Sequence, residues 1–291
     1  MNKNKKTILI TGASSGLGLS ITKLLMQLSE YILILTARET SLNRFEQENI
    51  FESNNLLIRP LDVTNREQRK KVVEEIVDKF GCVDVLINNA GFTYRAVIEH
   101  VTEDEKLKQM EINFRAPMEL IRVTLPAMRK KREGLIINIS SVGGMMAMPT
   151  MAIYSASKFA LEGASEALWY EVKPWNINVV LVEPGFIHSN SFLKVRMTPL
   201  SKNELDNQNA PYHFHYKYMA NFIEKMMKLS PATPEKIAKK VLKIIKAKNP
   251  PLRVRATLDA TFFAMLRRFL PRKFYHWFLY KNLPGIKYWG Q

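Results

Sequence analysis

The sequence is poor in cysteine and contains no long apolar run. Its single cysteine, Cys82, excludes an internal disulfide framework and any CxxC-type metal or redox site, so we expect a reducing compartment. No stretch of about 18 uninterrupted apolar residues is present, which argues against a membrane-spanning helix. The polar start of the chain leads directly into an apolar strand pattern, without the features of a secretory signal. These features predict a cytoplasmic protein.

The last fifth of the chain has few acidic residues. Between Ala232 and Gln291, fourteen lysines and arginines stand against two acidic residues, a net charge of +12 out of +16 for the whole chain. This asymmetry points to an acidic partner for the C-terminal end: a membrane surface, a nucleic acid or an acidic protein. The alternative interpretation is a solvated basic face.

Short apolar runs alternate with longer amphipathic segments up to about Gly185. Each run is almost continuously hydrophobic, which is typical of parallel strands buried on both faces. The expected strands are Thr7–Thr11, Ile32–Ala37, Leu56–Leu61, Val83–Asn88, Leu135–Ser140 and Val179–Glu183. The expected helices are Leu17–Leu28, Arg66–Phe80, Glu103–Arg132 and Tyr154–Lys173. This pattern predicts an α/β fold: a Rossmann-type doubly wound parallel sheet with helices on both faces.

The alternation breaks after Gly185, which bears on the domain organisation. We expect residues 1–257 to form one domain, with a substrate lid at 190–230, a basic helix over Pro234–Lys248 and a last strand within Leu252–Thr257. A disordered surface excursion is the alternative for 190–230. Residues 258–291 are predicted to form a helical extension rich in basic and aromatic residues.

A glycine-rich turn follows the first expected strand and opens the first helix. Its sequence is Thr11-Gly-Ala-Ser-Ser-Gly-Leu-Gly18. Glycines at these positions permit a tight turn and let the backbone approach a pyrophosphate, while the helix N-terminus offers free N–H groups. In this strand–turn–helix context the motif predicts a dinucleotide site.

The end of the second expected strand carries no acidic residue. Arg38 stands where an acid would hydrogen-bond the adenine ribose of NAD. A guanidinium can pair with a 2′-phosphate, so we expect NADP(H) as the cofactor. Alternatively, Arg38 stacks on adenine or points to solvent.

Three further residues form a candidate catalytic set. Tyr154 and Lys158 are four apart at the start of a helical segment, so their side chains share one face. Ser141 directly follows the strand Leu135–Ser140, at the strand end where ligands bind in parallel sheets. Ser140 is an alternative to Ser141, although the spacing to Tyr154 favours Ser141.

Taken in order, these motifs resemble the short-chain dehydrogenase/reductase superfamily over about positions 5–190, and more loosely its hydroxysteroid and retinol dehydrogenase-like branch. The matches are the TGxxxGxG turn at Thr11–Gly18, Asp62-Val63, the NNAG motif at Asn88–Gly91, Asn113, the Ser141, Tyr154 and Lys158 set, and Pro184-Gly185. Ser189 stands where the family often has threonine.

The resemblance implies roles for these residues. Ser141, Tyr154, Lys158 and Asn113 would be catalytic, with Lys158 also binding the nicotinamide ribose and Asn113 holding a water. The residues implied in cofactor binding are Gly12, Ser14, Ser15, Gly16, Leu17, Gly18, Arg38, Asp62, Val63, Asn89, Ala90, Gly91, Tyr154, Lys158, Pro184, Gly185, Ile187 and Ser189.

The chemistry of this set can be stated independently of the family. A free phenol has a pKa of about 10, and a neighbouring Lys158 ammonium is expected to lower that of Tyr154. Tyr154 would then give a proton to a carbonyl oxygen, or take one in the reverse direction. Ser141 would hydrogen-bond the same oxygen as charge develops on it.

The expected substrate is hydrophobic. Four methionines lie between Met145 and Met151, in the loop that the resemblance places against the substrate, where they would form an adaptable apolar wall. The predicted substrate contacts are Ser141, Met145, Met148 and Tyr154. Filling of core gaps is the alternative role for these methionines.

The composition of the C-terminal extension indicates which kind of partner, other than the substrate, the protein binds. Its mixture of aromatic and basic residues favours peripheral contact with a membrane surface. Packing on the core or in a dimer interface is the alternative. No nucleic-acid readout motif is visible, and no metal site is expected at His213 and His215, because other ligand types are missing nearby. A homodimer and a homotetramer are both open.

Together these observations predict an NADP(H)-dependent oxidoreductase that interconverts a carbonyl and an alcohol on a lipid-, steroid- or retinoid-like substrate. The competing class is a catalytically idle NADP-binding scaffold or sensor. An intact serine, tyrosine and lysine set argues against the scaffold, which would not need an acid.

Overall fold

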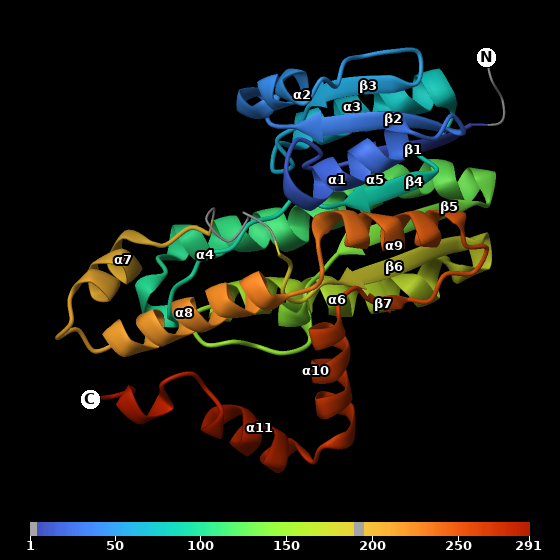
Figure 1. The fold of residues 1–291 in the computed structure, drawn as a ribbon. Helices are drawn as coiled ribbons and strands as arrows, with labels where there is room; N and C mark the ends of the chain where they lie inside the picture. The colour runs from blue at the N-terminus through green and yellow to red at the C-terminus, as the bar shows by residue number, and fades with distance from the viewer. Residues whose placement is uncertain (1–4, 189–194) are drawn as a thin grey trace.

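The computed structural model describes residues 5–188 and 195–291, and these residues are built around one parallel sheet (Figure 1). Seven strands are ordered β3-β2-β1-β4-β5-β6-β7, and every neighbouring pair is parallel. The strands are β1 (Lys6–Ile10), β2 (Tyr31–Ala37), β3 (Leu56–Pro60), β4 (Val85–Asn88), β5 (Gly134–Ile139), β6 (Ile177–Glu183) and β7 (Arg253–Arg255). The predicted doubly wound Rossmann-type fold is therefore confirmed.

Helices cover both faces of the sheet and explain why its strands are apolar along their whole length. Ile8, Leu9 and Ile10 of β1 are fully buried, pointing alternately to the two faces. One face packs against α1 (Gly16–Met26), α2 (Asn43–Gln47) and α9 (Pro234–Lys246). The other packs against α3 (Arg66–Phe80), α5 (Ala116–Lys131) and α6 (Ala152–Val172).

The strand order reverses between β1 and β4, which fixes where a ligand can bind. β2 lies on one side of β1 and β4 on the other, so the loops after these two strands diverge. In open parallel sheets this divergence leaves a crevice at the carboxyl ends of the strands. The glycine-rich turn and the Asn88–Gly91 motif lie at this crevice.

The long helix predicted over Glu103–Arg132 is interrupted. α4 (Glu103–Met110) begins with a capping box between Thr102 and Glu105, and a π-helical turn over Glu111–Arg115 then leads into α5. Because the π turn connects α4 and α5 directly, without a loop, the spacing of apolar residues does not reveal it. α2 was not predicted either, because five residues are too few for a helical period.

The predicted lid region contains two helices in its described part, α7 (Pro199–Asp206) and α8 (His213–Leu229). Tyr216 of α8 is fully buried, and its hydroxyl accepts a hydrogen bond from the Val97 N–H at 2.9 Å. The same hydroxyl lies 2.9 Å from Nδ1 of His100. These contacts fix α8 against the segment after β4.

The C-terminal extension consists of α10 (Leu258–Phe269) and α11 (Arg272–Lys281), which run away from the sheet before the chain turns back towards α8 (Figure 1). The return is made by aromatic contacts: Tyr288 stacks on Tyr218 with ring centres 5.3 Å apart. Among residues 5–188 and 195–291, no helix has the length and apolar content needed to cross a membrane.

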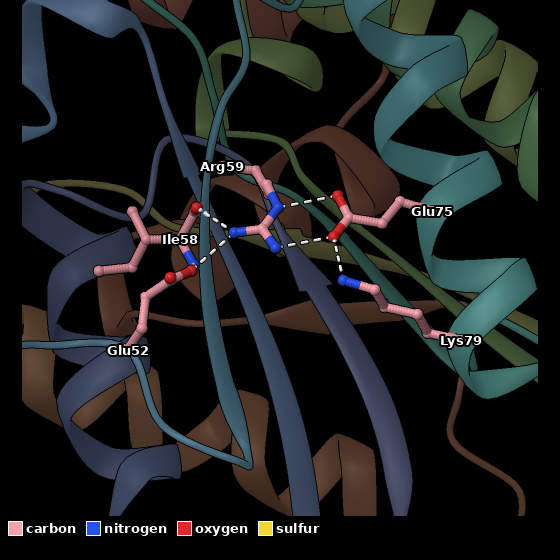
Figure 2. Close-up of polar contacts among 5 residues, drawn as sticks. All are labelled: Glu52, Ile58, Arg59, Glu75 and Lys79. Atoms are coloured by element: carbon pink, nitrogen blue, oxygen red, sulfur yellow. Dashed lines mark hydrogen bonds and ion pairs between the residues drawn. The ribbon is translucent and has the colours of Figure 1, made fainter.

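An ion-pair cluster joins the edge strand β3 to α3. The Arg59 guanidinium donates hydrogen bonds to both carboxylate oxygens of Glu75, while Lys79 donates to one of them and Glu52 accepts from Arg59 (Figure 2). β3 leads directly into Asp62 and Val63, so this cluster anchors the strand that carries them.

Candidate active site

The glycine-rich turn between β1 and α1 is shaped for a close backbone approach. Gly12 has φ +63°, a conformation that favours glycine, and a Cβ at Gly18 would overlap the Gly12 carbonyl and the Asn89 amide. The Asn89 side chain donates hydrogen bonds to the carbonyls of Thr11 (3.0 Å) and Gly12 (3.1 Å). The turn and the Asn88–Gly91 motif are therefore locked together, with Gly18 behind the cavity surface.

A cavity of about 580 Å³ extends from this turn along the carboxyl ends of β1 to β4. The predicted cofactor residues that line it are Gly12, Ser14, Ser15, Leu17, Arg38, Asp62, Val63, Asn89, Ala90 and Gly91. Arg44 of α2 lines this cavity together with Arg38. Arg44 could not be predicted from the sequence, because it belongs to no motif. Asp62 is engaged locally, since its carboxylate accepts hydrogen bonds from the Thr64 N–H and hydroxyl.

A second cavity of about 440 Å³ adjoins the first and contains the candidate catalytic side chains. The two cavities share the lining residues Ser15, Leu17, Asn89, Gly91 and Phe92. Gly16, Ser141, Tyr154, Lys158, Pro184, Gly185 and Ile187 line the second cavity. Together the two spaces form a continuous cleft whose glycine cradle and flanking cations fit a nicotinamide dinucleotide.

Tyr154 and Ser141 are brought together in this cleft. Burial raises the pKa of the Tyr154 phenol above its ordinary value, and a hydrogen bond with Ser141 works in the opposite direction. The expectation that the Lys158 ammonium lowers the Tyr154 pKa is therefore corrected: the pKa is raised, and burial is the main cause. Lys158 Nζ lies 5.9 Å from the centre of the Tyr154 ring, too far for a direct hydrogen bond to the ring face, and it donates to the Ile139 carbonyl at 2.9 Å.

Lys158 itself is strongly affected by its surroundings. Burial lowers the pKa of its ammonium to about 8, with Glu162 partly offsetting this effect. The group is therefore mostly charged at neutral pH. A buried cation near the Tyr154 ring favours negative charge that develops on the phenol during proton transfer.

Asn113 lies in the π-helical turn, directly behind Gly91. Its amide nitrogen donates to the Phe92 carbonyl (2.8 Å) and to the Ser157 hydroxyl (3.0 Å), and its oxygen accepts from the Phe92 N–H (3.0 Å). π turns occur frequently at functional sites because they change the register of a helix locally. Here the turn brings the Asn113 side chain towards the helix that carries Tyr154 and Lys158.

The neighbouring serines have different surroundings. Ser140 Oγ donates to Glu162 at 2.6 Å, within a buried network in which Arg253 also pairs with Glu162 and Glu183. Ser141 Oγ accepts from the Gly143 N–H at 3.0 Å and lies next to Tyr154. This geometry favours Ser141, because Ser140 is held by a carboxylate.

The Pro184-Gly185 turn is fixed from the start of the C-terminal extension. The Gly185 N–H donates to Thr257 Oγ1 at 2.9 Å, and the Phe186 N–H donates to Asp259 at 2.8 Å. Sequence reasoning missed Thr257 and Asp259, which are about 70 residues away along the chain. Ser189, predicted to contact the cofactor, lies outside the described residues.

Much of the lining of the second cavity is apolar. Met148, a predicted substrate contact, lines this cavity, and the structure adds Met151, Phe186, Ile223, Met227 and the buried Arg95. Met145, predicted to contact the substrate, is not among the residues that line this cavity: it follows the 3₁₀ turn at Val142–Gly144 and packs with Ala260 and Tyr275 of the extension. The added residues carry no local motif, and the fold alone brings them to the cavity.

Comparison with known proteins agrees with this geometry. The family model for short chain dehydrogenase matches residues 6–199. The chain is 40% identical over 265 residues to a 3-ketodihydrosphingosine reductase of Bacteroides thetaiotaomicron, covering 91% of this chain and 93% of that protein. A short-chain dehydrogenase structure from Streptomyces avermitilis superposes with a TM-score of 0.79 at 30% identity, covering 97% of each chain.

A further solved structure, ElxO with NADP bound, has a TM-score of 0.65 at 26% identity and covers 82% of this chain and 90% of its own. A nicotinamide dinucleotide is thus the cofactor class of this fold. The chain belongs to the short-chain dehydrogenase/reductase family of oxidoreductases.

Proposed function

We propose that the protein uses NADP(H) to reduce a ketone or aldehyde on a hydrophobic, lipid-like substrate, or to oxidise the corresponding alcohol. The observation that carries this proposal is the junction of the two cavities. Ser141 and Tyr154 line the second cavity together with apolar side chains, and this cavity adjoins the one that the glycine-rich turn lines. When bound, the nicotinamide would supply or take up the hydride.

The preference for NADP(H) over NAD(H) is supported by charge at the adenosine end of the cleft. Arg38 and Arg44 both line this end, where a 2′-phosphate would be bound. The acidic side chain of Asp62 also lines this cavity, but its carboxylate already accepts hydrogen bonds from Thr64. Two arginines at this end favour the phosphorylated cofactor.

The proton step follows from the states of Tyr154 and Lys158. A raised pKa keeps Tyr154 protonated at neutral pH, which suits it to donate a proton to a carbonyl oxygen as that oxygen becomes an alkoxide. Ser141 would donate a hydrogen bond to the same oxygen. The charged Lys158 would stabilise the phenolate that remains, so its contribution is greatest after the proton has moved.

The substrate class is supported by the cavity wall and by one relative. Met148, Met151, Phe186, Ile223 and Met227 offer flexible apolar surface for an alkyl chain. The relative with 40% identity is named for the reduction of 3-ketodihydrosphingosine, a long-chain ketone. We therefore propose a long-chain ketone as the first substrate to test.

The test is a titration of the pure protein with NADPH and with NADH, followed by turnover assays on long-chain ketones, steroids and retinoids. We expect tighter binding of NADPH and turnover on a long-chain ketone. Tighter NADH binding would overturn the argument from Arg38 and Arg44. Cofactor binding without turnover on any substrate would favour the scaffold interpretation.

A further inference from the structure

The two helices of the C-terminal extension have an inner face that attaches them to the domain. Ala260 of α10 and Tyr275 of α11 are buried against Met145 and Met146. Phe263, Ala264, Leu266, Leu270 and Leu279 pack around this contact. Arg267 stacks on Phe159 of α6, with its guanidinium carbon 5.1 Å from the ring centre. The apolar residues of this face are therefore accounted for by packing.

The opposite, outer face of α10 and α11 is also apolar, yet it is exposed. On α10 the spacing of four, three and four residues places the exposed apolar side chains in a single stripe, and α11 carries a second set of exposed aromatic side chains. The outer face consists of Leu258, Phe262, Met265 and Phe269 on α10 and Phe274, Trp277 and Tyr280 on α11, each between 48% and 78% exposed. Several exposed large apolar side chains gathered on two consecutive helices are typical of an interaction site.

Basic side chains flank this outer face. Residues 258–291 contain six lysines and arginines, and Arg268, Arg272 and Lys273 are exposed at the junction of the two helices. Asp259 is the one acidic residue in this part of the sequence, and its carboxylate accepts a hydrogen bond from the Phe186 N–H. The flanks of the outer face therefore present positive charge.

The neighbouring basic helix α9 is organised differently. Its lysines are exposed, but its apolar residues, including Ile237, Val241 and Ile244, are buried in the core against the sheet. The charge of α9 is thus a solvated side of a packed helix. Only where apolar side chains remain uncovered next to basic ones, as on α10 and α11, does the combination point to a partner.

We infer that the outer face of α10 and α11 docks on the surface of an anionic lipid bilayer. Exposed aromatic side chains beside lysines and arginines match both the apolar boundary and the negative head groups of such a surface. A second copy of this chain fits less well. A two-fold interface would place this face against itself and bring Arg268, Arg272 and Lys273 of each copy together without opposing acids in residues 258–291 other than Asp259.

The extension that carries the docking surface is attached to the candidate active site through its inner side. Met148 lines the second cavity and also packs against the inner side of the extension. Thr257 and Asp259, at the start of α10, hold the Pro184-Gly185 turn. A protein bound through α10 and α11 would therefore keep its substrate cavity close to the bilayer.

The test measures binding of the full chain to phosphatidylcholine vesicles with and without phosphatidylserine. We expect binding to the anionic vesicles alone. Neutralising Arg268, Arg272 and Lys273 to glutamine should weaken it by about 100-fold, at about fivefold for each charge. Phe262→Ser with Phe269→Ser should weaken it by about tenfold or more.

A matched control neutralises the same number of charges elsewhere. Lys239, Lys243 and Lys248 are exposed in and after α9, away from any uncovered apolar stripe, so their change to glutamine should have a much smaller effect. Trp277 supplies a local reporter: its emission should shift to the blue on vesicle binding, and Trp277→Phe should remove that shift while binding persists. Circular dichroism of each variant checks that it is folded.

Three results would overturn the inference. The first is equal binding to neutral and anionic vesicles, and the second is a loss in the α9 control as large as in the α10–α11 variant. The third is a dimer in gel filtration that Phe262→Ser with Phe269→Ser converts to a monomer, which would make this face a self-interface. These readouts are independent of substrate turnover, so they are separate from the test of the proposed function.

Discussion

Glu75→Gln tests how strongly one ion-pair cluster holds the edge of the sheet. Arg59 donates to Glu75 through Nε at 2.8 Å and Nη2 at 2.7 Å, and Lys79 donates at 2.7 Å (Figure 2). These contacts, chiefly the hydrogen bonds from Arg59, lower the pKa of Glu75 to about 2. Both partners of the bidentate pair are largely shielded, with 24% of each side chain exposed.

The size of the effect follows from the pKa. A shift from 4.5 to about 2 corresponds to roughly 3 kcal/mol at 1.36 kcal/mol per pKa unit, and partial exposure reduces it to about 2 kcal/mol. Because the pKa is depressed in the folded state, this stabilisation is complete above pH 4.5 and is lost as the pH falls towards 2. We expect Glu75→Gln to lower the Tm at pH 7 by about 4 °C.

Thermal unfolding followed by circular dichroism measures this difference from pH 7 downwards, as far as the protein stays folded. Glu74→Gln is the matched control: Glu74 is the adjacent residue on α3, and its pair with Lys70 is longer, at 3.7 Å, with both side chains 60% exposed. The control should change stability by about 0.5 kcal/mol or less. Equal effects of the two variants, or a Glu75→Gln effect that does not shrink below pH 4.5, would refute the reasoning.

Three further predictions address the cofactor, the site and its support. Arg38→Ala should weaken NADPH binding by roughly 10- to 100-fold and leave NADH binding nearly unchanged, as measured by fluorescence titration; equal loss for both cofactors would contradict the assignment. Burial lowers the pKa of Lys158 from 10.5 to about 8 in the folded protein. Between pH 8 and pH 10.5 the unfolded chain therefore binds this proton more tightly than the folded protein does. The contribution of Lys158 to stability therefore rises with pH across this window, and Lys158→Met should flatten that rise in urea unfolding. Arg253→Met leaves two buried carboxylates unpaired, and should lower the free energy of unfolding by about 3 kcal/mol at pH 7. No loss of stability in Arg253→Met would show that the carboxylates are neutral in the folded protein.

Much of the fold and the outline of the site could be predicted from the sequence, because each motif sits at the end of a strand that is apolar throughout. Burial on both faces produces such runs, and parallel order then brings their carboxyl ends to one edge. Ser141, Arg38 and Asn89 could therefore be assigned to one crevice before their distances were known. The structure places all three along the cleft.

The residues that could not be predicted depend on contacts distant in sequence or on local register. The π turn that positions Asn113 shifts the helical register within a single turn, a change too local to be recognised from the spacing of apolar residues. Arg95 reaches the cavity from a loop without a motif. The loop that carries Met145 lies between the cavity and the C-terminal extension, and both surroundings are apolar. A methionine suits either, so the composition of the loop does not predict which of them Met145 contacts.

The most direct test of the central claim compares Tyr154→Phe with Tyr170→Phe in single-turnover reduction of a long-chain ketone by NADPH. Tyr170 is a matched control, since it lies on the same helix, α6, and is exposed to solvent. If Tyr154 is the proton donor, Tyr154→Phe should slow turnover by about 10²- to 10⁴-fold with NADPH affinity retained, while Tyr170→Phe behaves as the unmodified protein. Turnover at the unmodified rate in Tyr154→Phe would contradict the assignment of Tyr154 as the acid.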